Sequence, residues 1–173
     1  MKKGLLIVCT GDGKGKTTAA LGMMFRALGH GMRVAMLQFM KSPDAGYGEY
    51  QAAKRFGVEI LQLGDGCTWN SADLNQSAAL AVQAWEQAKE RIVNGGDDLL
   101  VLDEFTFPFH FGWLDAAEAA DWLKTYKPQN LHLVVTGRGA PSEFLELADL
   151  ATDAMEIKHP YQRGVQAQAG IEF

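Results

Sequence analysis

The sequence predicts an α/β fold in which a mostly parallel sheet is flanked by helices. Short apolar runs bounded by glycine and turn residues alternate along the chain with longer stretches that carry helical stop signals. Strands that alternate with helices in this way pair in parallel, because each helix returns the chain across a face of the sheet. With 47% apolar and 21% charged residues, the composition is that of an ordinary globular protein. Residues 1–173 are therefore predicted to form a single domain with its own core.

The first half of the chain contains three of the predicted strands. Apolar runs at Gly4–Cys9, Arg33–Phe39 and Val58–Leu63 have lengths suited to strands that are buried on both faces. Helices are expected between them, at Thr17–Leu28 and Tyr47–Phe56. Each of these two stretches runs into glycine, which commonly terminates a helix.

The second half continues the alternation and ends in a segment of little periodicity. A long helix is predicted at Ala72–Val93, before a pair of glycines, and a shorter one at Asp115–Tyr126, before a proline. Strands are predicted at Leu99–Leu102 and Leu131–Val135. The last stretch, His159–Phe173, is interrupted by glycine and proline, so we expect a packed tail or loop there.

Charge and cysteine content restrict the class of protein to which the chain can belong and the compartment in which it is expected to work. The net charge of −5 argues against a general nucleic-acid binder, which usually presents a basic face. The apolar run near the N-terminus is too short for a signal-peptide core, and no membrane span is expected. Cys9 and Cys67 form no CxxC pair, so neither a disulfide scaffold nor a zinc site is indicated. A reducing cytoplasm is the predicted location.

A glycine-rich loop follows the first strand and opens the first helix. Its predicted ATP-binding residues are Gly11, Asp12, Gly13, Lys14, Gly15, Lys16, Thr17 and Thr18. In this Walker A pattern, backbone N–H groups and the helix N-terminus hold phosphate oxygens, Lys16 adds a positive charge, and the Thr17 hydroxyl can bind magnesium. Thr10 stands where the first glycine of the pattern would be, which predicts a slightly different entry turn. Lys14 is either a second phosphate contact or a solvated loop charge.

Two carboxylates follow the buried run at Leu99–Leu102. Asp103 and Glu104 fit a Walker B position, whose acid holds magnesium directly or through water. Together with the glycine-rich loop they predict a P-loop NTPase-like (RecA-like) sheet. A GTPase would need an NKxD motif, which the sequence lacks, so ATP is the predicted nucleotide. Three reactions stay open on this chemistry alone: ATP hydrolysis, phosphoryl transfer as in a small-molecule kinase, or attack elsewhere on ATP.

Over nearly its full length the chain resembles the ATP:corrinoid adenosyltransferases. The segments that carry the resemblance are Val8–Thr18, Arg26–Gly31, Gln38–Lys41, Thr68–Trp69, Val101–Glu104, Thr136–Gly139 and Gly164–Ile171. Many families share the phosphate loop and the acidic strand end. The TGRG sequence at Thr136–Gly139 and the terminal GVxAQxGI sequence at Gly164–Ile171 are far more specific.

The resemblance implies an unusual use of ATP. The cobalt(I) of a reduced corrinoid attacks the ribose C5′ carbon, forms a Co–C bond and expels the whole triphosphate. The implied partners are ATP, the corrinoid substrate, an electron-donating reductase and a second subunit in a homodimer. The open alternatives are a P-loop ATPase or small-molecule kinase and a non-catalytic protein that delivers corrinoid.

The resemblance also implies roles for particular residues. Magnesium, or manganese, would be held near Thr17 and Glu104 with Asp103 beside them. Apart from the resemblance, Arg138 stands at the end of the following strand, where ligands of open α/β sheets bind, and is expected to meet phosphate or ribose. The corrinoid would face the loop that contains Cys67, Thr68 and Trp69. Family members commonly carry an aromatic residue at the position of Cys67, so the shielding of cobalt is expected to differ here. Many members also carry a polar helix before the first strand, where this chain begins, and a cover over the site is therefore expected to be missing.

One aromatic segment lies outside these motifs. A phenylalanine or tryptophan occupies every second position from Phe105 to Trp113. This alternation favours a half-buried edge, a core segment or a subunit contact, with a wall of the corrinoid site as the alternative. His110, inside this segment, is predicted to be structural.

Overall fold

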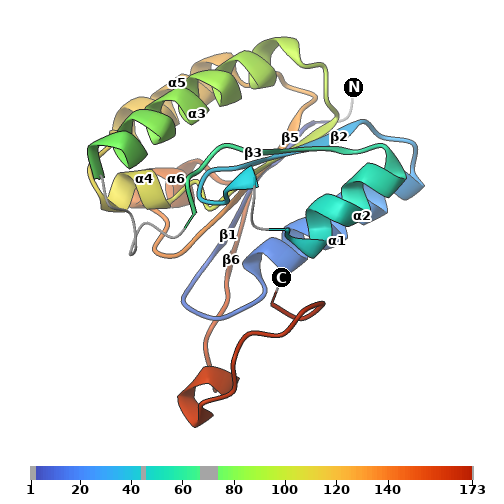
Figure 1. Cartoon of the computed structure of the whole chain (residues 1–173). Helices are drawn as coiled ribbons and strands as arrows, with labels where there is room; N and C mark the ends of the chain where they lie inside the picture. Colours follow the sequence, from blue (N-terminus) through green and yellow to red (C-terminus); the bar gives the residue numbers. More distant parts are fainter. Residues whose placement is uncertain (1–2, 44–45, 67–73, 173) are drawn as a thin grey trace.

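The computed structural model describes residues 3–43, 46–66 and 74–172. Its centre is a six-stranded sheet with the order β3-β2-β4-β5-β1-β6, in which neighbouring strands all pair in parallel (Figure 1). The strands are β1 (Leu6–Thr10), β2 (Val34–Gln38), β3 (Glu59–Gln62), β4 (Leu99–Asp103), β5 (His132–Thr136) and β6 (Leu150–Asp153). The predicted α/β class with a P-loop type of sheet is confirmed.

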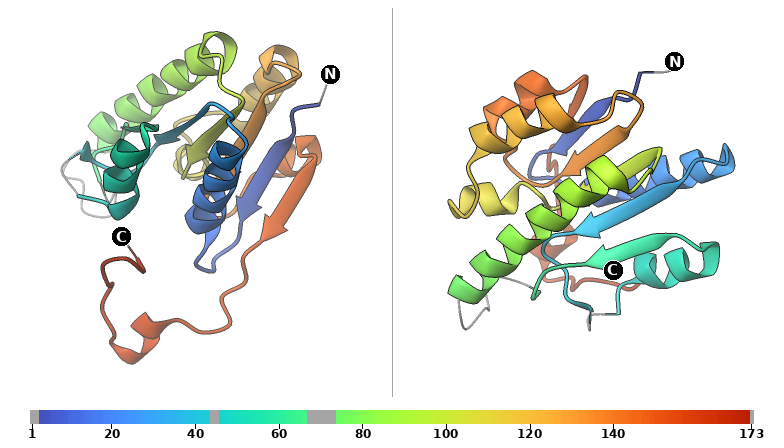
Figure 2. Two further views of the ribbon diagram at one scale, coloured as in Figure 1. Left: turned by 90° about the vertical axis from the view of Figure 1, so that its right-hand side faces the viewer. Right: turned by 90° about the horizontal axis from the view of Figure 1, so that it is seen from above.

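Helices cover both faces of the sheet and bury two separate apolar clusters (Figure 2). The helices are α1 (Lys16–Gly29), α2 (Gly48–Phe56), α3 (Leu74–Asn94), α4 (Phe107–His110), α5 (Ala116–Tyr126) and α6 (Ser142–Leu147). Residues of α1 and α2 pack on one face, around Met36 and Val101. Residues of α3, α5 and α6 pack on the other face, around Phe105 and Leu133. Successive strand residues therefore serve opposite clusters, which explains why the strands are apolar throughout.

The predicted strands and helices are confirmed, with their ends shifted by one or two residues, and three elements were missed. β6 pairs with β1 at the edge of the sheet, but all four of its residues, Leu150–Asp153, are exposed. Its sequence, LATD, has no apolar run that would identify it as a strand. α4 and α6 have only four and six residues, too few to show a helical period.

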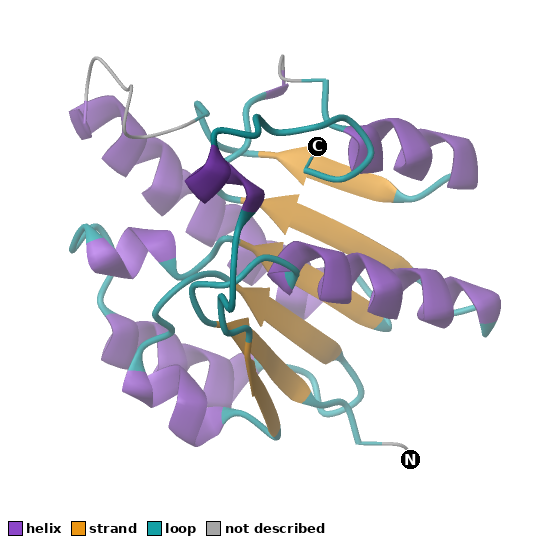
Figure 3. Ribbon diagram, turned by 90° about the horizontal axis from the view of Figure 1, so that it is seen from below, coloured by secondary structure: helices purple, strands orange, loops and turns teal. Residues whose placement is uncertain are grey.

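The residues after β6 form a tail that is mostly exposed. It contains one 3₁₀ turn, Pro160–Arg163, and therefore fits the predicted loop rather than a packed segment. Figure 3 shows the tail leaving β6, crossing in front of the sheet and ending near α1 and α2. Within the ranges that the structure describes, no helix is both long and apolar enough to span a membrane.

Candidate active site

The phosphate loop lies between β1 and α1. Gly15 precedes the helix with φ 117°, a conformation that favours glycine, and no side chain caps the first turn of α1. The first N–H groups of α1 therefore point at the loop without a side-chain partner, as they do where a helix N-terminus binds an anion. Lys16 is only 7% exposed, and its Nζ donates hydrogen bonds to the carbonyls of Gly11 and Gly13, each at 2.8 Å. Burial lowers the pKa of this ammonium, and the charge of Glu104 opposes that effect.

Hydrogen bonds hold the phosphate loop in place on both sides. The Thr10 hydroxyl accepts a hydrogen bond from the Ala140 N–H at 2.9 Å, and the Gly13 N–H donates to the Ala154 carbonyl at 2.6 Å. A Cβ on Gly11 would lie 2.1 Å from Asp153 Oδ1, so only glycine allows the loop to pass this close to the end of β6. Thr10, which replaces the usual glycine, thus ties the loop entry to the segment after β5.

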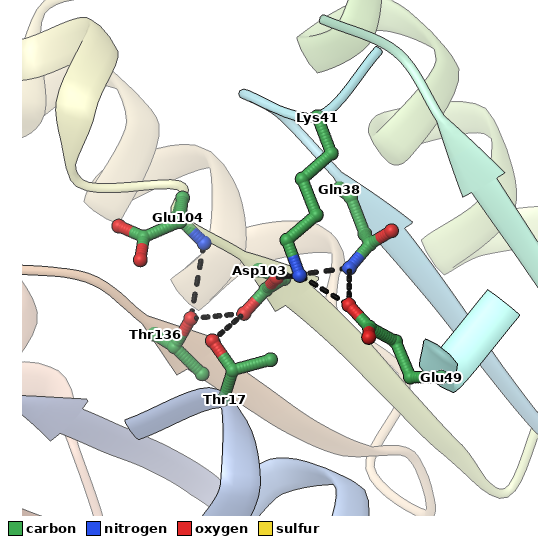
Figure 4. A network of polar contacts seen from close by, with 7 residues as sticks. All are labelled: Thr17, Gln38, Lys41, Glu49, Asp103, Glu104 and Thr136. Carbon is green, nitrogen blue, oxygen red and sulfur yellow. Dashed lines mark hydrogen bonds and ion pairs between the residues drawn. The ribbon is translucent and has the colours of Figure 1, made fainter. Parts of the chain in front are cut away.

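Asp103, at the end of β4, is the centre of a buried polar network (Figure 4). It has no exposed surface. Its Oδ1 accepts hydrogen bonds from the hydroxyls of Thr17, at 2.8 Å, and Thr136, at 2.7 Å. Its Oδ2 accepts one from Gln38 Nε2 at 3.2 Å. Asp103 thus orients the Thr17 hydroxyl so that the oxygen lone pairs of Thr17 remain available to a cation.

Glu104 has an environment unlike that of Asp103. Its backbone φ is 57°, the only positive φ of a non-glycine residue in the described part of the chain. Its N–H donates to Thr136 Oγ1 at 3.0 Å, which fixes this conformation, and its side chain turns away from Asp103 (Figure 4). The carboxylate oxygen Oε2 is buried without a hydrogen-bond partner. Burial raises the pKa of Glu104, and the negative charge of Asp103 raises it further.

These groups fit a magnesium ion that is bound mainly through its nucleotide. Among the described residues, no group of three or more His, Cys, Asp or Glu side chains could hold a metal by itself. Magnesium in nucleotide sites usually takes one or two protein oxygens and fills its other positions with phosphate oxygens and water. The Thr17 hydroxyl and the unpartnered Glu104 oxygen are oxygen atoms of the kind that such an ion accepts, and both residues line the same cavity.

Lys41 and Glu49 extend the network toward α2. Glu49 Oε1 forms an ion pair with Lys41 Nζ and accepts a hydrogen bond from Gln38 Nε2 at 3.2 Å. Lys41 Nζ also lies 3.8 Å from Asp103 Oδ2 and 4.4 Å from the centre of the Tyr47 ring. Burial alone would raise the pKa of Glu49, but the hydrogen bond and the charge of Lys41 lower it below its ordinary value.

The segment after β5 carries Arg138. Gly137 has φ 142°, and a Cβ on it would lie 2.0 Å from Thr106 Oγ1, so glycine is required for this turn. The Arg138 carbonyl accepts a hydrogen bond from Thr106 Oγ1 at 2.7 Å and lies 2.9 Å from His110 Nε2. The Arg138 residue is exposed, and its charge is near enough to contribute to lowering the pKa of Lys16.

A cavity of about 890 Å³ opens between the phosphate loop, α1 and α2. Its polar end contains Lys14, Lys16, Thr17, Lys41 and Glu104. Its other walls are apolar and come mainly from the facing sides of the two helices and from β3; they include Leu21, Met24, Phe25, Leu28, Ala52, Ala53, Phe56, Val58 and Ile60. Such a volume exceeds what a triphosphate needs, and it places an apolar space directly beside the phosphate loop.

The tail supplies one side of this cavity. Gly170, Ile171 and Glu172 line it, and Glu172 Oε2 forms an ion pair with Lys14 Nζ at 2.8 Å. Ile171 is 66% exposed, so little apolar burial holds this part of the tail in place. This contact with the tail differs from both roles that the sequence predicts for Lys14, a phosphate contact and a solvated loop charge.

The Phe105–Trp113 segment is not an extended edge, because α4 and its flanking turns curl it into a compact form. Phe105 has no exposed surface and contacts the rings of Phe39, Trp85, Phe109 and Phe144. Of the roles predicted for this segment, a place in the core is therefore confirmed for Phe105. His110 contacts a backbone carbonyl, as expected for a structural residue.

The structure brings together most of the predicted site residues. The loop residues Lys14 to Thr18 and Glu104 face one cavity, and Asp103 lies beneath it. The predicted corrinoid-facing residues Cys67, Thr68 and Trp69 lie outside the described residues. Sequence reasoning missed Gln38, Thr136 and Glu49. Gln38 and Thr136 stand in segments that carry the family resemblance, whereas nothing in the sequence links Glu49 to Asp103.

Comparisons with known proteins agree with this geometry. The family described as "ATP:corrinoid adenosyltransferase BtuR/CobO/CobP" matches residues 2–173. A corrinoid adenosyltransferase from a Sinorhizobium species is 42% identical over 174 residues, which cover 99% of this chain and 81% of that protein. A corrinoid adenosyltransferase from Escherichia coli K12 is 36% identical over 99% of this chain and 87% of its own length. Corrinoid adenosyltransferase CobA from Salmonella typhimurium is 35% identical with the same coverage.

A solved structure of another protein supports the fold, but not the function. A KaiC-like protein from Pyrococcus horikoshii superposes with a TM-score of 0.50 and 13% identity, covering 88% of this chain and 74% of that one. At this identity the likeness concerns the fold alone, and it agrees with the six-stranded parallel sheet. The assignment to a family rests on the sequence matches that extend over nearly the whole chain. The chain belongs to the ATP:corrinoid adenosyltransferase family.

Proposed function

We propose that this protein transfers the 5′-deoxyadenosyl group of ATP to the cobalt(I) of a corrinoid and releases triphosphate, in the synthesis or salvage of adenosylcobalamin. The observation that carries the proposal is the cavity that joins the phosphate loop to an apolar space between α1 and α2. One end suits a polyanion, and the other suits the adenosyl group and a large apolar ring system. Membership of the family supports the same conclusion.

The chemistry needs a leaving group whose charge is stabilised as the bond breaks. The cobalt(I) electron pair forms the Co–C5′ bond while the C5′–O bond breaks, and the electron pair of the broken C5′–O bond leaves with the triphosphate. The N–H groups at the start of α1 and the ammonium of Lys16 are already held in the loop. Preorganised donors of this kind stabilise charge that develops in the transition state. Neither a protein nucleophile nor a protein base is required.

Thr17 and Glu104 are the proposed ligands of magnesium, or manganese, and Asp103 acts through Thr17. Bound magnesium would supply further positive charge to the triphosphate oxygens. The buried, unpartnered oxygen of Glu104 and the lone pairs of Thr17, whose hydroxyl donates to Asp103, support this assignment. Arg138, exposed at the end of β5, is proposed to meet phosphate or ribose.

The remaining proposals concern the second substrate and the partners. Cys67, Thr68 and Trp69 are proposed to face the corrinoid, with the apolar walls from α1 and α2 beside them. Cobalt(II) must be reduced before it can attack carbon, so an electron-donating reductase is the proposed partner, in the cytoplasm. A homodimer is proposed from the family resemblance. The single six-stranded sheet supports the prediction of one domain.

A P-loop ATPase or kinase is the second candidate. The position of Glu104 favours it, because a carboxylate beside the phosphate loop can orient a water molecule or an acceptor for attack on the γ-phosphate. The two candidates break different bonds and therefore release different products: triphosphate in one case, ADP in the other.

Product analysis under anaerobic conditions tests the proposed function. The protein is incubated with ATP, magnesium, a cobalamin and a strong chemical reductant. Adenosyl transfer should give the light-sensitive absorption spectrum of an adenosylcorrinoid and an equal amount of tripolyphosphate, over many turnovers. Release of ADP or AMP without that spectrum would show that the proposal is wrong. Lys16→Ala is the control that should remove both products, because it removes the loop ammonium.

A further inference from the structure

Lys41 lies between two carboxylates that belong to different elements. Its Nζ forms an ion pair with Glu49 in the first turn of α2, and it lies 3.8 Å from Asp103 Oδ2 at the end of β4 (Figure 4). The side chains of Lys41 and Glu49 are 18% and 11% exposed, and that of Asp103 is fully buried. All three charges are thus largely removed from water, where electrostatic interactions are stronger than at the surface.

Asp103 has no other cationic neighbour among the ion pairs of the described residues. Its remaining partners, Thr17, Thr136 and Gln38, are neutral donors. A buried carboxylate without a counter-charge is costly, so the Lys41 ammonium at 3.8 Å offsets part of the cost of burying the Asp103 side chain. That same ammonium also opposes the approach of any other cation to this part of the cavity.

Glu49 reduces this repulsion between the Lys41 ammonium and another cation. It forms an ion pair with the Lys41 ammonium and thereby compensates its charge, while the Gln38 amide donates a hydrogen bond to each of the two carboxylates. Asp103 Oδ1 remains engaged with Thr17 and Thr136 rather than with the lysine. The pair also links the segment after β2 to α2, since Lys41 lies three residues beyond the end of β2 and Glu49 is the second residue of α2.

We propose that Glu49 and Lys41 are positioning residues of the metal–nucleotide site, where Glu49 compensates the charge that Lys41 places beside Asp103 and so sets the affinity for the divalent cation. Neither residue needs to touch the metal. The inference rests on the proposed ATP and magnesium site, but not on what happens to the adenosyl group afterwards. Because Glu49 lies in the first turn of α2, the helix that forms one wall of the cavity, the same pair connects the metal site to that wall.

The electrostatics predict opposite effects for the two single variants. In Glu49→Gln the Lys41 charge is no longer compensated, so binding of the cation should weaken by about three- to tenfold. In Lys41→Gln a positive charge is removed, and binding of the cation should tighten by about the same factor. The double variant replaces the ion pair with two neutral amides, and its affinity should lie close to that of the wild-type protein.

Manganese is the probe, because its electron paramagnetic resonance signal distinguishes free from bound ion. The full-length protein is titrated with Mn²⁺ in the presence of saturating ATP, and binding of tripolyphosphate without metal is measured separately by calorimetry. Glu59→Gln is the matched control: it makes the same charge change at the start of β3, where its carboxylate pairs with Arg91. It should leave the affinity for Mn²⁺ unchanged.

A merely structural role would give a different pattern. If the pair only held α2 in place, both single variants would weaken binding of Mn²⁺ and of tripolyphosphate alike, and that result would overturn the inference. So would equal affinities in all variants, or a wild-type protein that binds no Mn²⁺ with ATP. If wild-type protein binds Mn²⁺ with ATP yet forms no adenosylcorrinoid, the proposed function is wrong and this inference stands. The double variant keeps the test valid if Lys41→Gln alone fails to fold.

Discussion

Glu104 is the residue at which local strain and lost solvation coincide. A glutamate with φ 57° adopts a backbone conformation that L-residues with a Cβ rarely take, at a cost of roughly 1–3 kcal/mol. Its carboxylate is also buried with one unpartnered oxygen, beside the fully buried Asp103. Such costs are typical of residues kept for function, and a cation between Glu104 and Thr17 would remove the unfavourable electrostatics.

The raised pKa of Glu104 gives a prediction with a definite sign. A carboxyl group whose pKa is higher in the folded state destabilises that state once it ionises, so its penalty appears as the pH rises above about 4.3, the unfolded value. Without metal, Glu104→Gln should raise the melting temperature near pH 8 by about 2–4 °C, which corresponds to a gain of roughly 1 kcal/mol in the free energy of unfolding. Near pH 5 the rise should be smaller. Thermal unfolding followed by circular dichroism at both pH values measures this.

Glu146→Gln, on the exposed side of α6, is the control for the loss of a negative charge. It should change the melting temperature little at either pH. A lower melting temperature for Glu104→Gln near pH 8 would mean that the ionised carboxylate stabilises the protein and that the raised pKa is wrong. In the same variant, Mn²⁺ binding with ATP should weaken, because one proposed ligand loses its charge.

At the scale of elements, the tail depends on few contacts. After Asp153 it is tied to the loop by the bond between the Gly13 N–H and the Ala154 carbonyl, and again near its end by the pair of Lys14 and Glu172. Ile171 is largely exposed and adds little burial. Exposed or half-exposed ion pairs contribute about 0.2–1 kcal/mol, so the tail end should separate from the loop often.

Limited proteolysis measures that separation, because the tail contains the trypsin sites Lys158 and Arg163. Glu172→Gln should increase the rate at which cleavage after these residues releases the tail peptide by about two- to fivefold, as followed by mass spectrometry. Lys14→Gln should have the same effect. Combining the two changes should add nothing, because each of them removes the same ion pair. Additive effects would indicate that the two residues act separately.

Much of the element order could be predicted from the sequence, and particular features explain the rest. The buried strands were identifiable because runs such as Leu99–Leu102 are apolar on both faces. β6 was missed because its four exposed residues pair only through the backbone with β1. The phosphate loop and Asp103-Glu104 were recognisable as motifs. Glu49 was not, because its place in the site depends on how α2 packs, which sequence periodicity does not specify.

The whole molecule is a sheet with one apolar cluster on each face and its site at one edge. Parallel strands bring their carboxyl ends to the same edge, which is why Gln38, Asp103 and Thr136 meet there although they are far apart in the sequence. A ligand bound at this edge contacts the ends of several strands together. Its binding energy should therefore stabilise the whole fold rather than a single loop.

Nucleotide binding should be visible as a shift in global stability. At a ligand concentration about one hundred times the dissociation constant, binding adds about 2.7 kcal/mol to the free energy of unfolding. For a chain of this size, this corresponds to a rise in melting temperature of about 5–10 °C. We expect such a rise with ATP and magnesium, measured by differential scanning calorimetry, and none in Lys16→Ala.

A surface variant provides the comparison for Lys16→Ala. Lys89→Ala, on α3, removes a lysine that pairs with Glu86 and lies outside the cavity. Its rise in melting temperature with ATP should equal that of the wild-type protein. A rise that persists in Lys16→Ala would place the nucleotide elsewhere than in the phosphate loop.

The position of β1 also affects how the protein is made. β1 is synthesised before the other five strands, yet its two neighbours in the sheet are β5 and β6, the last two strands in the sequence. While the ribosome is still extending the chain, the phosphate loop therefore has neither the strands beside it nor the Ala154 carbonyl that holds Gly13. ATP cannot assist the early steps of folding, and the nascent N-terminal half carries an apolar strand that must be kept from aggregating until its late partners emerge.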